Sequence, residues 1–327
     1  MSTRRLGSKG PEISVLGLGT WAIGGPYEFG WGPVDDEESV AAIRFAIEAG
    51  INWIDTAPVY GMGHSEEIVG RALGPFATGE DVFVFTKCGR NYYGSDRISS
   101  DLRPETIKRE CDESLGRLRV DRIDLLQFHW PDLDTGSAIE DSWATMTALI
   151  EAGKVRWGGV SNFNVDQLER CESIRHVDSL QPPLNLLNQT AREDVIPWCG
   201  QHGVGVIAYA PLANGLLVGK FDRRAIGRLA EDDWRRRSPN FTEPVLSRNL
   251  QIVNSLRHIA NGLDFELAEL ALSWVLNVPA VTGAIVGART ADQVRGWLRA
   301  ATLRLSDSAL AEIEKAVDAA ASASHEI

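Results

Sequence analysis

Four side chains whose types suit proton transfer follow three short apolar runs of the sequence. Asp55 ends the first run and Tyr60 lies five residues later, Lys87 ends the second run, and His129 ends the third. Strand-like runs that finish in a functional side chain are typical of the C-terminal rim of a parallel barrel, where such side chains come together. A carboxylate, a phenol, an amine and an imidazole on one rim could transfer a proton.

Tyr60 is the candidate general acid of this set. A free tyrosine has a pKa of about 10, which is too high for efficient proton exchange near neutral pH. A lysine ammonium beside a phenol favours the phenolate, so we expect Lys87 to lower the pKa of Tyr60. Asp55 is expected to pair with Lys87 and hold it in place. His129 is expected to donate a hydrogen bond to a substrate oxygen and stabilise the negative charge that develops there.

The apolar runs recur along the whole chain, and between each pair there is room for a helix. They lie at 15–19, 51–55, 82–87, 123–129, 156–161, 179–184, 204–209 and 281–286. Eight such units favour a closed (β/α)8 TIM barrel, which needs about 250 residues. We therefore expect residues 1–327 to form a single barrel domain. A short N-terminal β-hairpin is expected to close the bottom of the barrel.

The intervening segments carry helix signals. One predicted helix begins at the acidic pair Asp35–Asp36 and places Val40, Ile43 and Ile47 on one face. Another begins at Pro104, because proline suits the first position of a helix. Both helices are expected to pack their apolar faces on the sheet.

One motif points to a different fold. Residues 17–22 match the G-x-G-x-x-A fingerprint of dinucleotide-binding Rossmann domains. That fingerprint requires a helix to start within the glycines, so that the helix N-terminus can meet a pyrophosphate. Gly24-Gly25-Pro26 follows at once and should prevent such a helix. A Rossmann domain is therefore not expected.

Composition excludes several classes of partner. A net charge of -12 argues against nucleic acid and anionic membranes as partners of the whole protein. No run approaches the roughly 20 apolar residues of a membrane span, and no apolar stretch follows the N-terminal arginines as in a secretory signal. The four cysteines are scattered, which favours free thiols in a reducing compartment. The protein is expected to be cytoplasmic, and the spacing of its six histidines predicts no metal site.

Polar residues also end the later apolar runs. Ser161, Asn162 and Gln181 could bind a carboxamide such as that of nicotinamide, and Tyr209 could stack under its ring. Residues 287–290, Gly-Ala-Arg-Thr, begin a helix after the last run and could bind a phosphate. An N-capping threonine with an exposed arginine is an equally simple explanation of that segment.

Residues 211–245 are long for a connection in a compact domain, and such loops are usually functional or disordered. The segment concentrates positive charge in an acidic protein, with Lys220, Arg223, Arg224, Arg228, Arg235, Arg236 and Arg237. It could be a lid that meets phosphates. It could also be a solvated segment, because Asp222, Glu231, Asp232 and Asp233 are interleaved.

Taken together, these motifs resemble the aldo-keto reductase family over nearly the whole chain, most closely its bacterial and plant branch related to general stress reductases. The matching segments are 18–21, 50–61, 86–87, 127–129, 158–162, 209–212, 215–220 and 285–289. The resemblance implies a catalytic tetrad of Asp55, Tyr60, Lys87 and His129, and reduction of an aldehyde or ketone with NADPH. The family often has an asparagine that touches the adenine where this chain has Trp297, so packing on Trp297 is expected instead.

The resemblance also implies a set of contacts. Expected cofactor contacts are Thr20, Trp21, Ser161, Asn162, Gln181, Tyr209, Pro211, Leu212, Gly215, Leu216, Lys220, Arg237, Gly287, Ala288, Arg289 and Gln293. The expected substrate pocket is Trp21, Trp31, Tyr60, Tyr92 and Trp130, with Tyr27, Phe29 and Tyr93 nearby. These aromatic residues suit a small carbonyl compound, either sugar-like or aromatic, or they serve as loop packing or a subunit interface.

Two other functions stay open. Lys87 could form a Schiff base in a lyase, or the protein could be a non-catalytic subunit that binds NADPH and contacts a partner. The oligomeric state is also open.

Overall fold

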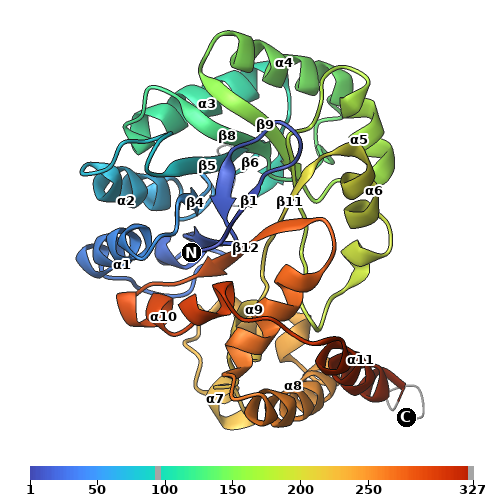
Figure 1. The fold of residues 1–327 in the computed structure, drawn as a ribbon. Coiled ribbons are helices and arrows are strands. Elements are labelled where there is room, and N and C mark those ends of the chain that lie inside the picture. Colours follow the sequence, from blue (N-terminus) through green and yellow to red (C-terminus); the bar gives the residue numbers. More distant parts are fainter. Residues whose placement is uncertain (93–96, 323–327) are drawn as a thin grey trace.

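Eight parallel strands form a closed barrel surrounded by helices (Figure 1). The structure is a computed structural model and describes residues 1–92 and 97–322. In order around the barrel, the strands are β3 (Leu16–Gly19), β4 (Trp53–Asp55), β5 (Phe83–Cys88), β8 (Ile123–Phe128), β9 (Val155–Ser161), β10 (Ser179–Gln181), β11 (Gly205–Ala208) and β12 (Val281–Gly287). Because β12 pairs with β3, the sheet has no free edge. The predicted (β/α)8 barrel is confirmed.

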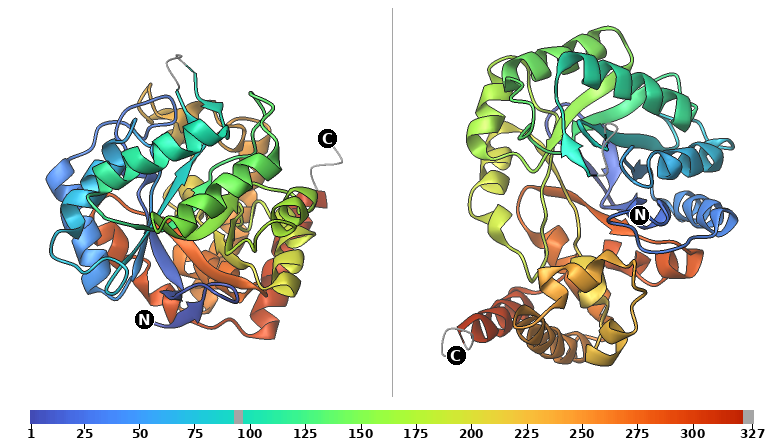
Figure 2. Two further views of the ribbon diagram at one scale, coloured as in Figure 1. Left: turned by 90° about the horizontal axis from the view of Figure 1, so that it is seen from above. Right: turned by 180° about the vertical axis from the view of Figure 1, so that it is seen from behind.

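Helices follow the strands and cover the outside of the barrel (Figure 2). They are α1 (Asp36–Glu48), α2 (His64–Leu73), α3 (Pro104–Leu118), α4 (Ile139–Glu151), α5 (Val165–Glu172), α6 (Val195–His202), α7 (Arg223–Gly227), α8 (Val245–Gly262), α9 (Leu267–Asn277), α10 (Ala291–Arg295) and α11 (Asp307–Ser322). Both α8 and α9 lie between β11 and β12 in the chain, and α11 packs against α8. Short 3-10 turns are η1 (Trp21–Ile23), η2 (Thr190–Arg192) and η6 (Leu298–Ala301).

The helix signals of the sequence are confirmed in α1 and α3. Asp35 caps α1 by accepting a backbone N–H, and Val40, Ile43 and Ile47 are buried against the sheet. Pro104 is the first residue of α3. Some strands end a few residues away from the predicted ends of the apolar runs. β10 ends at Gln181 because two prolines follow, and proline has no N–H to donate to the ladder.

A β-hairpin closes one end of the barrel, as the sequence predicted. It consists of β1 (Thr3–Arg5) and β2 (Glu12–Ser14), which pair antiparallel. Leu6 and Ile13 are fully buried and pack with the residues inside the barrel. Figure 1 views this end, and the right panel of Figure 2 views the opposite end. Because the hairpin fills the N-terminal end, the C-terminal rim is the open end of the barrel in the part of the chain that the structure describes.

The barrel interior is built in layers, because alternate residues of a strand point inward. The apolar layer consists of Trp53, Phe85, Leu125, Ile207 and Ile285. Two residues further along β4, β5 and β8 are Asp55, Lys87 and Gln127. A polar layer therefore lies directly above an apolar one, and the same alternation that forms the core aims these side chains into the barrel mouth.

Gly17 and Gly19 of the Rossmann-like motif serve the barrel instead of a nucleotide. Both lie within β3, and the segment that follows is only the single turn η1. A Cβ atom added to Gly17 would lie 2.2 Å from Cε2 of Trp53. The glycine therefore makes room for the largest side chain of the apolar layer, and the prediction that this is not a Rossmann domain is confirmed.

Gly17→Ala is expected to destabilise the protein by about 1–3 kcal/mol, because the new methyl group overpacks the core against Trp53. Gly116→Ala is the matched control. Gly116 lies inside α3 with open space where a Cβ would be, so this change should stabilise by about 0.5–1 kcal/mol. Urea unfolding measures the free energy of unfolding of both variants. Equal stability of Gly17→Ala and the parent would contradict the packing argument.

Candidate active site

Asp55 and Lys87 form a buried ion pair at the ends of neighbouring strands. Lys87 Nζ lies 2.6 Å from Asp55 Oδ1, and the two side chains are 0% and 3% exposed. The same Nζ donates to the Thr56 carbonyl oxygen at 2.9 Å and to the Tyr60 hydroxyl at 3.4 Å. Removing one member of a buried pair typically costs about 3–5 kcal/mol, because the other charge is left uncompensated. Loss of either partner alone should therefore destabilise the fold as well as the site.

Tyr60 lies in the turn after β4, with its hydroxyl directed to this pair. Its ring meets the ring of His129 edge to face, with centroids 5.8 Å apart. Burial raises the pKa of Tyr60 well above its ordinary value, and the negative charge of Asp55 adds to this. The expectation that Lys87 gives Tyr60 a lowered pKa is therefore wrong for this structure. Burial also lowers the pKa of Lys87, although Asp55 opposes that shift.

His129 is an uncharged imidazole in this site. Burial lowers its pKa well below the ordinary value, and the positive charges of Lys87 and Arg90 act in the same direction. Its Nδ1 is buried and has no hydrogen-bond partner among the described residues. The backbone carbonyl of His129 accepts from the side chain of Asn162 at 3.0 Å, which fixes the end of β8 to the end of β9.

Two amides hold the other oxygen of the Asp55 carboxylate. Gln181 Nε2 lies 2.8 Å from Oδ2 and Gln127 Nε2 lies 3.3 Å from it. Gln181 Nε2 also donates to Gln127 Oε1 at 3.1 Å. Gln181 was expected to contact a cofactor, and the structure places it against Asp55. Gln127 was not singled out as a site residue. Gln127 could have been found from the sequence, because it lies two residues before His129 and therefore on the same side of the strand.

The polar ends of the later strands form one hydrogen-bonded chain. The Ser161 hydroxyl donates to the Gln181 carbonyl at 2.7 Å, and Asn162 Nδ2 donates to that hydroxyl at 3.0 Å. The Tyr209 hydroxyl donates to Asn162 Oδ1 at 3.0 Å. Asn162 adopts a left-handed conformation with φ of 63°, which asparagine tolerates better than most residues. The structure thus brings together the three residues that the sequence suggested for a carboxamide and Tyr209, which it suggested for stacking under the ring.

An aromatic cluster lies beside Tyr60. Trp21 stacks 6.3 Å from Tyr60 and meets Trp31 edge to face at 5.4 Å. Trp234 stacks on Trp21 with ring centroids 5.1 Å apart. Trp234 was not predicted from the sequence, because it comes from a distant segment. Thr20 does not face this cluster: it is fully buried and donates to the Asp55 carbonyl at 3.1 Å.

Segment 211–245 is ordered by short helices. These are η3 (Ala213–Val218), α7, η4 (Trp234–Arg237) and η5 (Pro239–Phe241). Arg237 donates to the Glu28 carbonyl at 2.9 Å, and Arg235 lies over the Trp31 ring at 4.4 Å while paired with Asp233. This segment is therefore fastened to the loop after β3. Both arginines make contacts within the protein.

The expected cofactor contacts in and around η3 differ in accessibility. Leu216 and Pro211 are buried, Leu212 is half-buried and Lys220 is exposed. Gly215 has φ of 102°, a left-handed conformation that strongly favours glycine. A Cβ there would lie 2.9 Å from the Phe221 ring.

The end of β12 carries a partly exposed arginine. Arg289 Nη1 lies 3.4 Å from the Trp31 carbonyl, and its backbone N–H donates to Gln293 Oε1 at 2.8 Å. Gly287 is exposed and Ala288 is buried. The expectation that Trp297 packs on an adenine is wrong, because Trp297 is 4% exposed and belongs to the core between barrel and helices.

Tyr92 lies near Glu28 in the loop after β3, and Trp130 follows His129 at the end of β8. Tyr92 lines a groove of about 570 Å³ with Met62 and other residues, and none of the tetrad lines it. The Trp130 ring contacts the guanidinium of Arg90 at 5.3 Å. Tyr93 lies outside the described residues.

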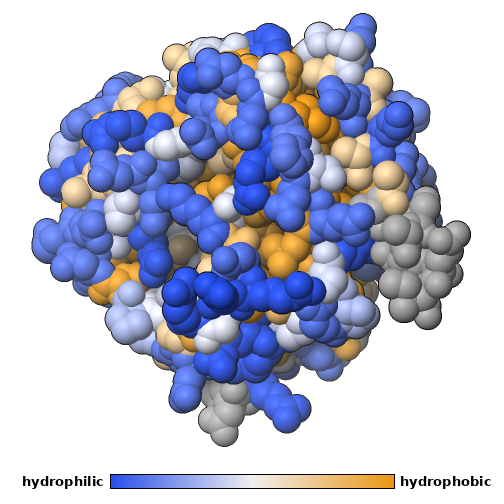
Figure 3. All heavy atoms as spheres, turned by 90° about the horizontal axis from the view of Figure 1, so that it is seen from below, coloured by the Kyte–Doolittle hydropathy of each residue, from blue (hydrophilic) through white to orange (hydrophobic). Residues whose placement is uncertain are grey.

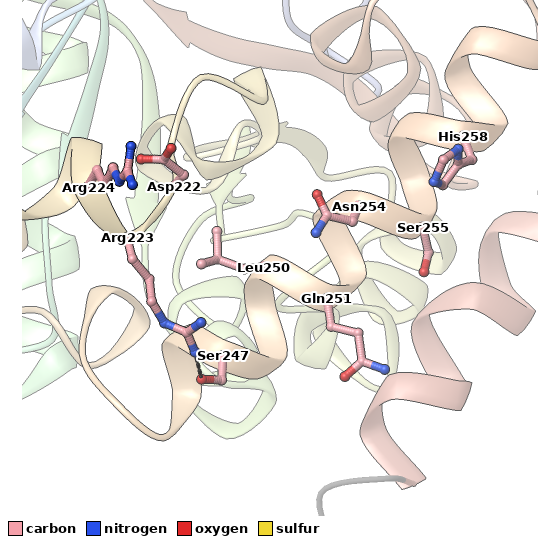
Figure 4. Close-up of a pocket in the computed structure, with 9 residues that line it drawn as sticks. All are labelled: Asp222, Arg223, Arg224, Ser247, Leu250, Gln251, Asn254, Ser255 and His258. Atoms are coloured by element: carbon pink, nitrogen blue, oxygen red, sulfur yellow. Dashed lines mark hydrogen bonds between the residues drawn. The ribbon is translucent and has the colours of Figure 1, made fainter.

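A second groove, of about 650 Å³, lies between α7 and α8 (Figure 4). Leu250 is the one apolar residue type among the nine residues described as lining it, and Arg223 donates to the Ser247 hydroxyl across it at 2.7 Å. Seen from the side on which α7 and α8 lie, hydrophilic residues cover most of the surface (Figure 3). The groove shares no residue with the tetrad.

Comparison with known proteins decides the family. The sequence model of the Aldo/keto reductase family matches residues 15–318. The chain belongs to the aldo/keto reductase family. Members of this family are oxidoreductases that act on carbonyl compounds with a nicotinamide cofactor. The four residues of the tetrad motif thus lie together in a chain of this family, on the barrel that its resemblance implied.

Relatives span bacteria and plants. Aldo-keto reductase YhdN of Bacillus subtilis is 35% identical over 91% of this chain and 89% of its own. An NADH-specific methylglyoxal reductase of Escherichia coli is 31% identical over 93% and 94%. A probable aldo-keto reductase 1 of Glycine max is 29% identical over 96% and 88%. The glycerol dehydrogenase AKR11B4 of Gluconobacter oxydans superposes with a TM-score of 0.86 at 37% identity, over 97% of this chain and 95% of that one.

Three further observations concern the whole molecule. No helix within residues 1–92 and 97–322 combines the length and apolar character needed to cross a membrane. Over the same ranges, no three His, Cys, Asp or Glu side chains gather into a group that could hold a metal ion. All four cysteines are buried free thiols.

The low pKa of His129 predicts a pH effect on stability. In the unfolded chain its pKa returns to about 6.5, so below that pH the unfolded state binds a proton that the folded state does not. His129 therefore costs stability as the pH falls. Between about pH 7.5 and pH 5, the His129→Asn variant should lose less free energy of unfolding than the parent. His258→Asn, at an exposed site on α8, should follow the parent. Identical losses for parent and His129→Asn in urea unfolding would contradict the shift.

Proposed function

We propose that this protein is an NADPH-dependent reductase that converts an aldehyde or ketone to an alcohol, with Tyr60 as the general acid. The observation that carries the proposal is the contact chain from Asp55 through Lys87 to the hydroxyl of Tyr60, at 2.6 and 3.4 Å. It lies at the open end of the barrel, where this fold places its active sites. Family membership supports the same reaction class.

The protein's own part in the reaction is to hold and release one proton. Because burial raises the pKa of Tyr60, its phenol is protonated at neutral pH and can act as a donor. Lys87 lies beside the hydroxyl and would stabilise the phenolate left after proton transfer. Asp55 keeps Lys87 in place. The neutral His129, whose Nδ1 has no hydrogen-bond partner within residues 1–92 and 97–322, is proposed to hydrogen-bond the substrate oxygen.

The residues around the tetrad fit a nicotinamide cofactor. Ser161, Asn162 and Tyr209 form a polar chain beside His129, so they are proposed to hold the carboxamide end of the cofactor. When bound, the nicotinamide supplies a hydride to the carbonyl carbon. Gln181 is proposed to support this end by way of Asp55 and to line the cofactor site. Trp21 of the aromatic cluster is proposed to line the substrate side.

Segment 211–245 is proposed to cover the cofactor. It is fastened to the loop after β3 by Arg237 and by the stacking of Trp234 on Trp21. The left-handed backbone at Asn214 and Gly215 is of the kind that aims successive main-chain N–H groups at an anion, so it is proposed to meet phosphate groups. Lys220 is exposed and could meet a phosphate. Arg235 is committed to Asp233 and to aromatic rings, so it is not assigned to a phosphate.

Arg289 is the residue on which the preference for NADPH depends. Its guanidinium is partly exposed, lies 3.4 Å from the Trp31 carbonyl, and is near enough to Asp233 for its charge to help lower the pKa of that carboxyl. Guanidinium suits the extra phosphate of NADPH because it forms two parallel hydrogen bonds to phosphate oxygens. The methylglyoxal reductase relative is NADH-specific, so the cofactor preference must be measured for this chain.

The substrate is proposed to be a small carbonyl compound with polar, sugar-like character. The relatives named for methylglyoxal and glycerol act on small oxygenated compounds. In this chain Trp21, Trp31 and Tyr60 supply aromatic surface next to the proton donor. Aromatic faces beside polar groups suit a small molecule that carries both C–H and O–H groups.

The two alternative functions have less support. A Schiff-base lyase needs a free amine at Lys87, whereas its Nζ is fully buried and contacts Asp55, Thr56 and Tyr60. A non-catalytic subunit that binds NADPH would not need the intact set of four residues. Covalent trapping with borohydride would support the lyase, and cofactor binding without turnover on any carbonyl would support the subunit.

Tyr60→Phe is expected to lower kcat by about 100-fold to 10,000-fold, because the variant has no phenolic proton to donate. The dissociation constant of NADPH should stay close to that of the parent, since the ring remains. Absorbance at the nicotinamide band follows turnover, and fluorescence titration follows binding. Full activity of the variant would remove Tyr60 from its proposed role.

Arg289→Ala is expected to weaken the binding of NADPH by about 1.5–3 kcal/mol, which is the value of a hydrogen bond to a charged group. The binding of NADH should change much less. Arg295→Ala is the control, because Arg295 is an exposed arginine on α10, paired with Asp292. The measurement is the dissociation constant of NADPH and of NADH for the parent, Arg289→Ala and Arg295→Ala. Equal weakening of NADPH and NADH would count against a contact with the extra phosphate.

A further inference from the structure

Gln127 lies in the polar layer of the barrel and contacts the carboxylate of Asp55 directly. Its Nε2 lies 3.3 Å from Asp55 Oδ2, and its Oε1 accepts from Gln181 Nε2 at 3.1 Å. The side chain is fully buried. Because Oδ1 of the same carboxylate accepts from Lys87, each oxygen of Asp55 is held by a different partner.

The strand register makes this contact possible. Gln127 on β8 pairs with Lys87 on β5 and with Gly159 on β9. A Cβ atom on residue 159 would lie 3.1 Å from Gln127 Cγ and 2.9 Å from the Ser179 carbonyl oxygen. A side chain there would crowd Gln127 out of its path. The glycine thus leaves room for Gln127 to reach across the barrel to Asp55.

Holding both oxygens of the Asp55 carboxylate limits the rotation of that group. A carboxylate held only by Lys87 could turn about its Cβ–Cγ bond, because that torsion has a broad energy minimum. Lys87 Nζ would follow the oxygen it contacts, and the Tyr60 hydroxyl lies only 3.4 Å from that Nζ. Amide donors on Oδ2 oppose this rotation. A displacement that starts at Asp55 would therefore end at the proposed proton donor.

We propose that Gln127 is a positioning residue: it fixes the orientation of the Asp55 carboxylate and, through Lys87, the location of the Tyr60 hydroxyl. This inference rests on the proposed reductase function. Gln127 acts through Asp55 and needs no contact with substrate or cofactor.

The test uses Gln127→Met, which keeps the length of the side chain and removes its hydrogen bonds. Leu126→Met is the control, because Leu126 is buried on the outer face of the same strand. We expect Gln127→Met to lower kcat about tenfold, as for a loss of about 1.4 kcal/mol in transition-state stabilisation. The dissociation constant of NADPH and the melting temperature should match those of Leu126→Met.

A double-mutant cycle with Asp55→Asn separates positioning from a general structural effect. If Gln127 acts through Asp55, then in the Asp55→Asn background Gln127→Met should lower kcat by far less than tenfold. If Gln127→Met lowered kcat by the same factor in both backgrounds, or only together with the melting temperature, the positioning role of Gln127 would be overturned. An active parent with an equally active Gln127→Met variant would overturn it and leave the proposed function intact. A parent with no NADPH-dependent activity would overturn both.

Discussion

The buried ion pair of Asp55 and Lys87 is the constraint on which the site depends. Two charges withdrawn from water are stable only when every polar atom around them is satisfied. Here Lys87 also donates to the Thr56 carbonyl and the Tyr60 hydroxyl, while Gln127 and Gln181 donate to Asp55. Four elements of the barrel are tied to one pair of charges. Disturbing one member of the geometry proposed to be catalytic should therefore also destabilise the barrel, because a buried charge would be left unpaired.

The layered barrel explains why such a pair can exist. The hairpin and the residues around Trp53 fill the lower barrel with apolar side chains, so the next layer up is shielded from water on one side. The aromatic cluster of Trp21, Trp31 and Trp234 covers part of the other side. This enclosure accounts for the opposite pKa shifts of the site: burial raises the pKa of Tyr60 and lowers that of His129.

Much of this arrangement could be predicted from local sequence. Polar residues at the ends of apolar runs located the tetrad, because strand ends meet on one rim in a parallel barrel. The pKa of Tyr60 could not be predicted, since it depends on burial more than on its neighbour Lys87. Gln127 and Trp234 were missed because their contacts depend on barrel closure and on a distant segment. Trp297 was considered as a packing surface for an adenine only because of its place in the family motif, and an aromatic residue in a helical region packs equally well in the core.

The central claim is that this rim reduces a carbonyl group with hydrogen taken from the nicotinamide. The most direct measurement is to follow deuterium from NADPH labelled at C4 of its nicotinamide, with methylglyoxal and glyceraldehyde as probes and mass spectrometry of the alcohol formed. The account predicts one deuterium on the carbinol carbon of each product molecule and none from labelled water at that position. Oxidation of the cofactor without label in the alcohol, or an alcohol whose carbinol hydrogen comes from water, would contradict it.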